Sequence, residues 1–102
     1  MDAIVFALLC KALSDSNRVK IVELLVNGEM CGCKLLDNLQ ITQPTLSHHM
    51  KILSECGLVK SRRVWKNIYY SLNCETLTAF QNYVEHLKCG PSCMALAEVD
   101  LC

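Results

Sequence analysis

The chain has 102 residues, of which 52% are hydrophobic and 20% charged, and its ten basic and ten acidic residues cancel. This length fits one small domain and leaves no room for a second core, while the apolar content excludes a disordered chain. A core of this size gives a narrow stability margin, so we expect a further apolar face to be closed by formation of a homodimer.

The first apolar run, residues 3–10, is too short to span a membrane and lacks the basic flank of a signal peptide. We therefore expect a cytoplasmic protein without a membrane partner. In that reducing compartment its eight cysteines stay free thiols, which bind metal or carry out redox chemistry rather than form a disulfide framework.

Apolar residues recur at helical spacing over residues 2–13, which predicts a first helix. Ser14-Asp15 is a typical cap for a second helix, and Asn27-Gly28 closes it. The second helix is strongly apolar from Val19 to Val26, so we expect it to lie in the core.

A short helix is expected from about Gly32 to Leu39, with Leu35, Leu36 and Leu39 on its buried side. Thr42 then serves as the N-cap of a further helix that carries Pro44 in its first turn. Two helices joined by such a short turn form a helix-turn-helix, whose second helix enters the major groove of DNA.

The second helix of this motif extends to about Cys56 and has two different faces. Leu46, Met50 and Leu53 point inward at helical spacing. The outer face carries hydrogen-bonding or cationic side chains, namely Gln43, Thr45, Ser47, His48 and Lys51. Such groups suit base edges and phosphates, so we expect them to bind DNA.

Two strands are expected after Gly57, over residues 58–65 and 68–72, with Lys66-Asn67 as the tip of a hairpin. Asn67 accepts the positive φ that such a turn requires. The hairpin carries the cations Arg62, Arg63 and Lys66. A hairpin directly after a helix-turn-helix is the wing of a winged helix, where cations contact phosphate or the minor groove.

The distribution of charge favours this interpretation. Residues 41–70 carry five basic residues against Glu55, a net charge of +4, whereas residues 1–40 carry −1 and residues 71–102 carry −3. A basic block between acidic segments is typical of an anion-binding face, with nucleic acid as the anion, although a solvated helix and hairpin would give the same count.

An amphipathic helix is expected from Glu75 to about Lys88, where Gly90-Pro91 stops it. Its apolar stripe contains Leu77, Phe80, Tyr83, Val84 and Leu87. This stripe and the first helix form the candidate dimer surface. The predicted fold is mainly α with a β-hairpin, a homodimeric winged helix-turn-helix in the order α-α-α-α-β-β-α. Residues 1–88 form the DNA-binding and dimerisation domain, and residues 89–102 form a cysteine-containing tail.

Residues 12–18, 29–36 and 43–51, together with Gly57-Leu58-Val59, resemble the ArsR family of metal-sensing repressors, and the run Gln-Pro-Thr-Leu-Ser-His-His is the most specific part. The resemblance covers roughly residues 3–88. It implies a dimeric winged helix, without enzymatic activity, that occupies an operator and leaves it when metal binds. In the arsenic-responsive branch a Cys-x-Cys at the start of the third helix binds trivalent arsenic or antimony, and Cys31 and Cys33 match those positions.

The chemistry of the thiols agrees with this resemblance. Thiolates select soft ions, and trivalent arsenic takes three of them, whereas structural zinc takes four ligands. Residues i and i+2 of a helix point about 200° apart, so Cys31 and Cys33 should chelate one ion only if the helix start is frayed or is distorted by binding, and Gly32 eases the distortion. That distortion would disturb the DNA-reading helix, and the helix N-terminus should favour thiolates.

The third thiol stays open between Cys10, Cys56 and a tail cysteine of either subunit. Alternatively, Cys89, Cys93 and Cys102 form a separate three-thiol site in the tail, and the two sites are compatible with each other. A zinc site on the last helix is disfavoured, because Glu85 and His86 are adjacent and face different ways.

The sequence thus predicts a repressor that trivalent arsenic or antimony releases from DNA, with no organic cofactor. The alternatives are a sensor of another soft metal, cadmium or lead, and a thiol redox or persulfide sensor on the same scaffold. A thiol-dependent enzyme is disfavoured, because the chain has no Cys-x-x-Cys and no α/β pattern around its thiols.

Overall fold

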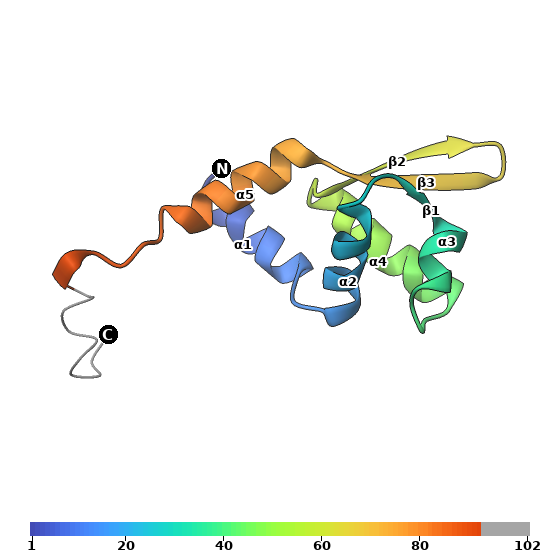
Figure 1. The fold of residues 1–102 in the computed structure, drawn as a ribbon, viewed down its shortest axis with the longest axis horizontal. Helices are drawn as coiled ribbons and strands as arrows, with labels where there is room; N and C mark the ends of the chain where they lie inside the picture. Colours follow the sequence, from blue (N-terminus) through green and yellow to red (C-terminus); the bar gives the residue numbers. More distant parts are fainter. Residues whose placement is uncertain (93–102) are drawn as a thin grey trace.

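The computed structural model describes residues 1–92, so the tail cysteines Cys93 and Cys102 lie outside the described residues. The elements are α1 (Ala3–Ala12), α2 (Ser16–Leu25), β1 (Met30–Cys31), α3 (Gly32–Asp37), α4 (Gln43–Glu55), β2 (Val59–Val64), β3 (Asn67–Leu72) and α5 (Cys74–Glu85). In Figure 1 α1 and α5 lie together at one end, and α3, the start of α4 and the β2–β3 hairpin lie at the other. This arrangement confirms the predicted winged helix-turn-helix.

Side-chain caps decide where the helices begin. The Asp15 carboxylate accepts hydrogen bonds from the backbone N–H groups of Asn17 and Arg18, at 2.8 and 3.2 Å. The Thr42 hydroxyl accepts one from the N–H of Thr45 at 3.4 Å, with Pro44 in the first turn of α4. Both caps satisfy N–H groups that have no partner inside the helix, and both were predicted.

The core is built by one face of each of α1 to α4 and by the base of the hairpin. Its buried apolar residues are Leu9, Ala12, Ile21, Leu25, Leu35, Leu39, Leu46, Met50, Leu53, Leu58, Val59 and Leu72. The inward face predicted for α4 is confirmed. In α2, however, Val19 and Val26 are 39% and 64% exposed. Val19 lies about 200° around the helix from the buried Ile21, and Val26 is the C-cap.

The sheet contains a strand that the sequence did not predict. Its order is β1-β3-β2, with Met30 opposite Tyr70 and Cys31 opposite Tyr69. A strand of two residues is too short to show an alternating pattern, and only its partner β3 identifies it.

The turn of the hairpin differs from the prediction by one residue. Val64 pairs with Asn67, so the tip is Trp65-Lys66, and Trp65 rather than Asn67 has a positive φ, of 59°. The register follows from the base of the hairpin, where the buried Val59 faces the buried Leu72. A slip of one residue would turn one of them away from the core.

Candidate nucleic-acid interface and thiol pair

The outer face of α4 presents the polar side chains that were predicted to bind DNA. Gln43, Thr45, Ser47, His48 and Lys51 are all exposed. Gln43 donates a hydrogen bond from Nε2 to the Ser47 hydroxyl at 3.3 Å, so these two side chains lie along one edge of the helix. Because α4 begins at the same end of the molecule as the hairpin (Figure 1), this edge and the wing can approach one duplex together.

Behind that face, a buried histidine connects α4 to the start of α2. His49 is 6% exposed, and its Nδ1 lies 3.0 Å from Nη1 of Arg18. An arginine only donates, so Nδ1 is the acceptor and Nε2 carries the proton, 3.9 Å from the Asp15 carboxylate. Arg18 also donates from Nε to the carbonyl of Ala12 at 2.6 Å. Burial lowers the pKa of His49 below its ordinary value, although Asp15 opposes this.

The sequence contained no sign of the contact between His49 and Arg18. The two residues are 31 positions apart, and only the packing of α2 against α4 brings them together. This contact holds α4 to the body of the domain.

The wing cations lie in two different environments. Arg62 donates to both carboxylate oxygens of Glu29, at 2.7 and 2.6 Å, and its guanidinium lies 5.1 Å from the centre of the Tyr69 ring. The hydrogen bond from Arg62 holds the pKa of Glu29 below its usual value. Arg63 and Lys66 are exposed and form no ion pair within residues 1–92. Of the three predicted wing cations, Arg63 and Lys66 are therefore the ones whose charge is available to a phosphate.

Cys31 and Cys33 form a thiol pair at the start of α3. Their Sγ atoms are 2.9 Å apart. Cys31 is the N-cap of α3, with extended backbone angles of φ −76° and ψ 156°, and it belongs to β1 rather than to the helix. The expected 200° divergence therefore does not arise, because it applies only to two residues inside a helix, and the two sulfurs meet without a distortion of α3.

The two thiols differ in acidity. The contact with the Cys33 thiol, helped by the backbone N–H of Lys34, lowers the pKa of Cys31 below its ordinary value. The same contact raises the pKa of Cys33. Cys31 is thus the first of the pair to become a thiolate. The backbone N–H of Lys34 at the start of α3 favours the thiolate of both cysteines, but at Cys33 the contact with Cys31 and burial outweigh it.

A third ligand does not accompany the pair within residues 1–92, where no group of three metal-binding side chains occurs. Cys10 and Cys89 are exposed, and Cys56 is half-buried with its thiol directed at the carbonyl of Leu53, 3.3 Å away. Of the predicted tail site only Cys89 is described. The described chain therefore brings two thiols together, and these are Cys31 and Cys33.

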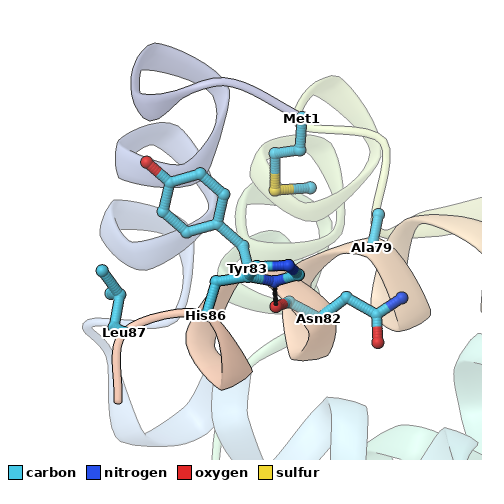
Figure 2. Close-up of a pocket in the computed structure, with 6 residues that line it drawn as sticks. All are labelled: Met1, Ala79, Asn82, Tyr83, His86 and Leu87. Carbon is cyan, nitrogen blue, oxygen red and sulfur yellow. Dashed lines mark hydrogen bonds between the residues drawn. The ribbon is translucent and has the colours of Figure 1, made fainter. Parts of the chain in front are cut away.

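At the opposite end of the molecule, α1 and α5 pack through stacked rings, since Phe6 lies 5.1 Å from Phe80 and 4.3 Å from Tyr83, centre to centre. Apolar side chains remain exposed beside this stack, namely Met1, Ile4, Val5, Leu8, Val84 and Leu87. We call this set the apolar face. A pocket of about 570 Å³ borders this face at Met1 and Leu87, and its other lining residues are Ala79, Asn82, Tyr83 and His86. Figure 2 shows these six residues. The apolar face overlaps the candidate dimer surface only in part. Val84, Leu87 and the exposed side of α1 remain available, whereas Leu77 and Phe80 pack against the core of the same domain.

Within the described residues, each helix is too short or too polar to cross a lipid bilayer.

Residues 15–61 match the family model described as bacterial regulatory protein, arsR family. An arsenical resistance operon repressor of Staphylococcus aureus is 51% identical over 63 residues, which cover 62% of this chain and 61% of that protein. An uncharacterized HTH-type transcriptional regulator of Methanocaldococcus jannaschii is 49% identical, over 59% of this chain and 70% of that protein. A cadmium resistance transcriptional regulatory protein homolog of Staphylococcus aureus is 42% identical, over 64% and 54%.

Solved structures give the same result for the fold. An ArsR-like transcriptional regulator from Rhodococcus superposes with a TM-score of 0.73 at 26% identity, over 82% of this chain and 79% of that chain. HlyU from Vibrio cholerae superposes with a TM-score of 0.71 at 26% identity, over 88% and 100%. The family and the named relatives are regulators of transcription rather than enzymes.

Proposed function

Because this chain belongs to the ArsR family of bacterial regulatory proteins, we propose that it is a repressor that binds operator DNA as a homodimer and is released by trivalent arsenic or antimony. The observation that carries the inducer is the thiol pair, with two sulfurs 2.9 Å apart at the entrance to a helix that contacts α4. The relatedness to an arsenical resistance operon repressor supports the same choice, although the chain spans only 61% of that relative.

In this proposal α4 lies in the major groove. Gln43 and Ser47 read base edges near its N-terminal end, with Thr45 and His48 along the same flank. Phosphates are neutralised by Lys51 on α4 and by Arg63 and Lys66 on the wing. These contacts make the affinity for DNA depend on salt concentration. Arg62 contributes only when its pair with Glu29 opens.

A second copy of the chain covers the apolar face. Large exposed apolar patches on small domains mark interfaces, and α1 and α5 lie far from the DNA-binding end, so dimerisation leaves both α4 helices free (Figure 1). Two-fold symmetry then spaces the two α4 helices to reach half-sites about 34 Å apart, one turn of DNA.

Cys31 and Cys33 supply two of the three thiolates that trivalent arsenic requires. The third comes from Cys10, Cys56 or Cys89, or from a tail cysteine of either subunit, and Cys89, Cys93 and Cys102 stay candidates for a separate tail site. Because Cys31 belongs to β1 and Cys33 to α3, an ion bridging them pulls on two elements at once. Of these two elements, α3 contacts α4, and β1 pairs with the wing strand β3.

Two alternative inducers keep the same scaffold. Cadmium or lead would use the same soft thiolates, and a cadmium resistance regulator is among the relatives. A peroxide could instead oxidise the pair, with both thiols losing a proton and an electron to form one disulfide while the peroxide is reduced.

The test is a titration of the reduced protein on fluorescently labelled duplexes tiled across the DNA upstream of its own gene, at fixed salt, with arsenite, cadmium, zinc and peroxide added separately. Release by arsenite alone supports the proposal. Release by cadmium or peroxide but not by arsenite would make cadmium or peroxide the inducer in place of arsenic. Absence of binding to every duplex would overturn the repressor assignment.

The ligands are tested with Cys31→Ser/Cys33→Ser, which should bind DNA but resist arsenite. Cys74→Ser is the matched control, because Cys74 is an exposed thiol at the start of α5 that the proposal does not use. Unchanged release in the double variant would move the inducer site to the tail.

A further inference from the structure

The tip of the wing carries a side chain that the proposed function does not use. Trp65 is the only tryptophan in the chain, and it is 90% exposed, the highest value among the exposed large hydrophobic residues of the described chain. An aromatic ring held in water makes no contribution to the fold. The ring is therefore fully available to a partner outside the domain.

The backbone at Trp65 strengthens this point. Its φ of 59° is the only positive φ at a non-glycine residue within residues 1–92. Trp65 is the first residue of a two-residue hairpin loop, where a positive φ is the type II′ pattern that normally places glycine. A bulky side chain strains this conformation, so glycine would suit both the backbone and the solvent better.

The surroundings of Trp65 identify the kind of partner. Residues 61–67 are all exposed. Arg63 and Lys66, which form no ion pair within residues 1–92, lie on either side of Trp65 in the sequence. The hairpin also projects from the end of the molecule where α4 begins (Figure 1). The two cations suit a polyanionic surface, and the ring suits a narrow space with apolar walls. The minor groove of DNA combines both features, and it adjoins the major groove that α4 fills in the proposed complex.

On the basis of the proposed DNA-binding function, we propose that Trp65 is a specificity residue that enters the minor groove beside the α4 site. The groove is about 6 Å wide and admits a flat ring edge-on between its sugar walls. The indole Nε1–H only donates. A·T pairs present only acceptors at the floor of this groove, whereas G·C pairs add the N2 amino donor, so the wing selects A·T pairs.

The single tryptophan makes the test direct. The reduced full-length protein is titrated with the tiled upstream duplexes while the anisotropy of the DNA label and the Trp65 emission are recorded together. We expect both signals to saturate at the same concentration, with Trp65 shielded at least about twofold from acrylamide. Saturated anisotropy with unchanged emission and unchanged quenching overturns the Trp65 proposal and leaves the repressor intact. Absence of any anisotropy change overturns the repressor assignment, and the Trp65 proposal with it.

Two variants separate the ring from its N–H group. Trp65→Gly should bind the duplex about tenfold more weakly, because the ring contact is lost. It should melt no lower than the parent, since glycine suits this turn, so misfolding cannot account for the loss. Trp65→Phe should keep most of the affinity but lose the preference for A·T. Parent-like affinity of Trp65→Gly would overturn the proposal.

The base preference is tested with the footprinted duplex, in which the pairs under the wing are changed to G·C or to inosine·C. Inosine lacks the N2 amino group and resembles A·T in the minor groove while keeping the major-groove edge of guanine. The parent protein should bind the A·T and inosine·C duplexes alike and the G·C duplex several-fold more weakly. Equal binding of all three by the parent protein would overturn the specificity role.

Discussion

Arg62 donates a hydrogen bond to each carboxylate oxygen of Glu29, at 2.7 and 2.6 Å, across 33 positions of sequence. Glu29 directly precedes β1, and Arg62 lies opposite Tyr69, which in turn lies opposite Cys31. The pair therefore connects the wing to the segment that carries the thiol pair. It also neutralises one of the wing cations while it is closed.

Replacing Glu29 with Gln should release Arg62 to a phosphate. The variant should bind DNA more tightly at low salt, and the logarithmic salt slope should steepen by up to about 0.9, one phosphate contact, for each protomer. Thermal stability should change little, because the pair is exposed and screened by water. The measurement is DNA anisotropy at several salt concentrations.

The matched control for that change is Glu23→Gln, which removes an exposed carboxylate that forms no ion pair in the described chain. A salt slope that stays the same in the Glu29 variant, or changes equally in both variants, would contradict a specific release of Arg62.

Cys31 should react before Cys33 with an alkylating reagent. The pKa of Cys31 is lowered and that of Cys33 is raised, so Cys31 holds the larger thiolate fraction near neutral pH, and the thiolate is the nucleophile. Brief treatment with iodoacetamide and mass spectrometry of the peptides measures the order. Cys33→Ala removes the hydrogen bond and should slow alkylation of Cys31 at the same pH. Equal rates at the two cysteines of the parent would contradict the assignment.

His49 should make the domain less stable in acid. Its folded pKa lies below the unfolded value of about 6.5, so the neutral form is favoured in the folded state. The stability that it contributes is complete above that value and is lost as pH falls below it. The charged or titratable groups around the ring are Asp15, Arg18 and His48, and only Asp15 favours the protonated form.

Urea unfolding at pH 8 and pH 5 measures this loss. His49→Gln can still accept from Arg18 but cannot be protonated, so it should be less stable than the parent at pH 8 and show a smaller loss between the two pH values. His48→Gln is the control, since His48 is exposed, and it should keep the loss of the parent. An identical pH dependence in all three proteins would exclude His49 as its source.

A charge on the apolar face should separate the dimer. Leu87 is 66% exposed in the monomer, so Leu87→Glu costs the monomer little but buries an unpaired carboxylate if a second copy covers it. We expect the mass measured by light scattering to halve and the affinity for a two-half-site duplex to fall at least about tenfold.

Val26→Glu is the comparison for that variant, because Val26 is 64% exposed at the end of α2, outside the apolar face. It should keep the mass and the affinity of the parent. A parent-like mass in the Leu87 variant would place the dimer interface elsewhere or show that the chain is monomeric.

The sequence by itself determined the features that depend on neighbours a few residues away. The caps Asp15 and Thr42, and the inward face of Leu46, Met50 and Leu53, follow from rules that act within one or two helical turns. These features suffice for the winged helix-turn-helix order and for the exposed polar edge of α4, and the ArsR resemblance agrees with them.

Only the tertiary structure decided the features that join distant segments. β1 exists because β3 pairs with it, and that pairing takes Cys31 out of the helix and lets its sulfur reach Cys33. The hairpin register, set by burial at its base, moved the turn to Trp65. A pattern of residue types along the chain records which side chains prefer burial, but it does not record which partner each strand or charge meets, because that depends on packing across the whole core.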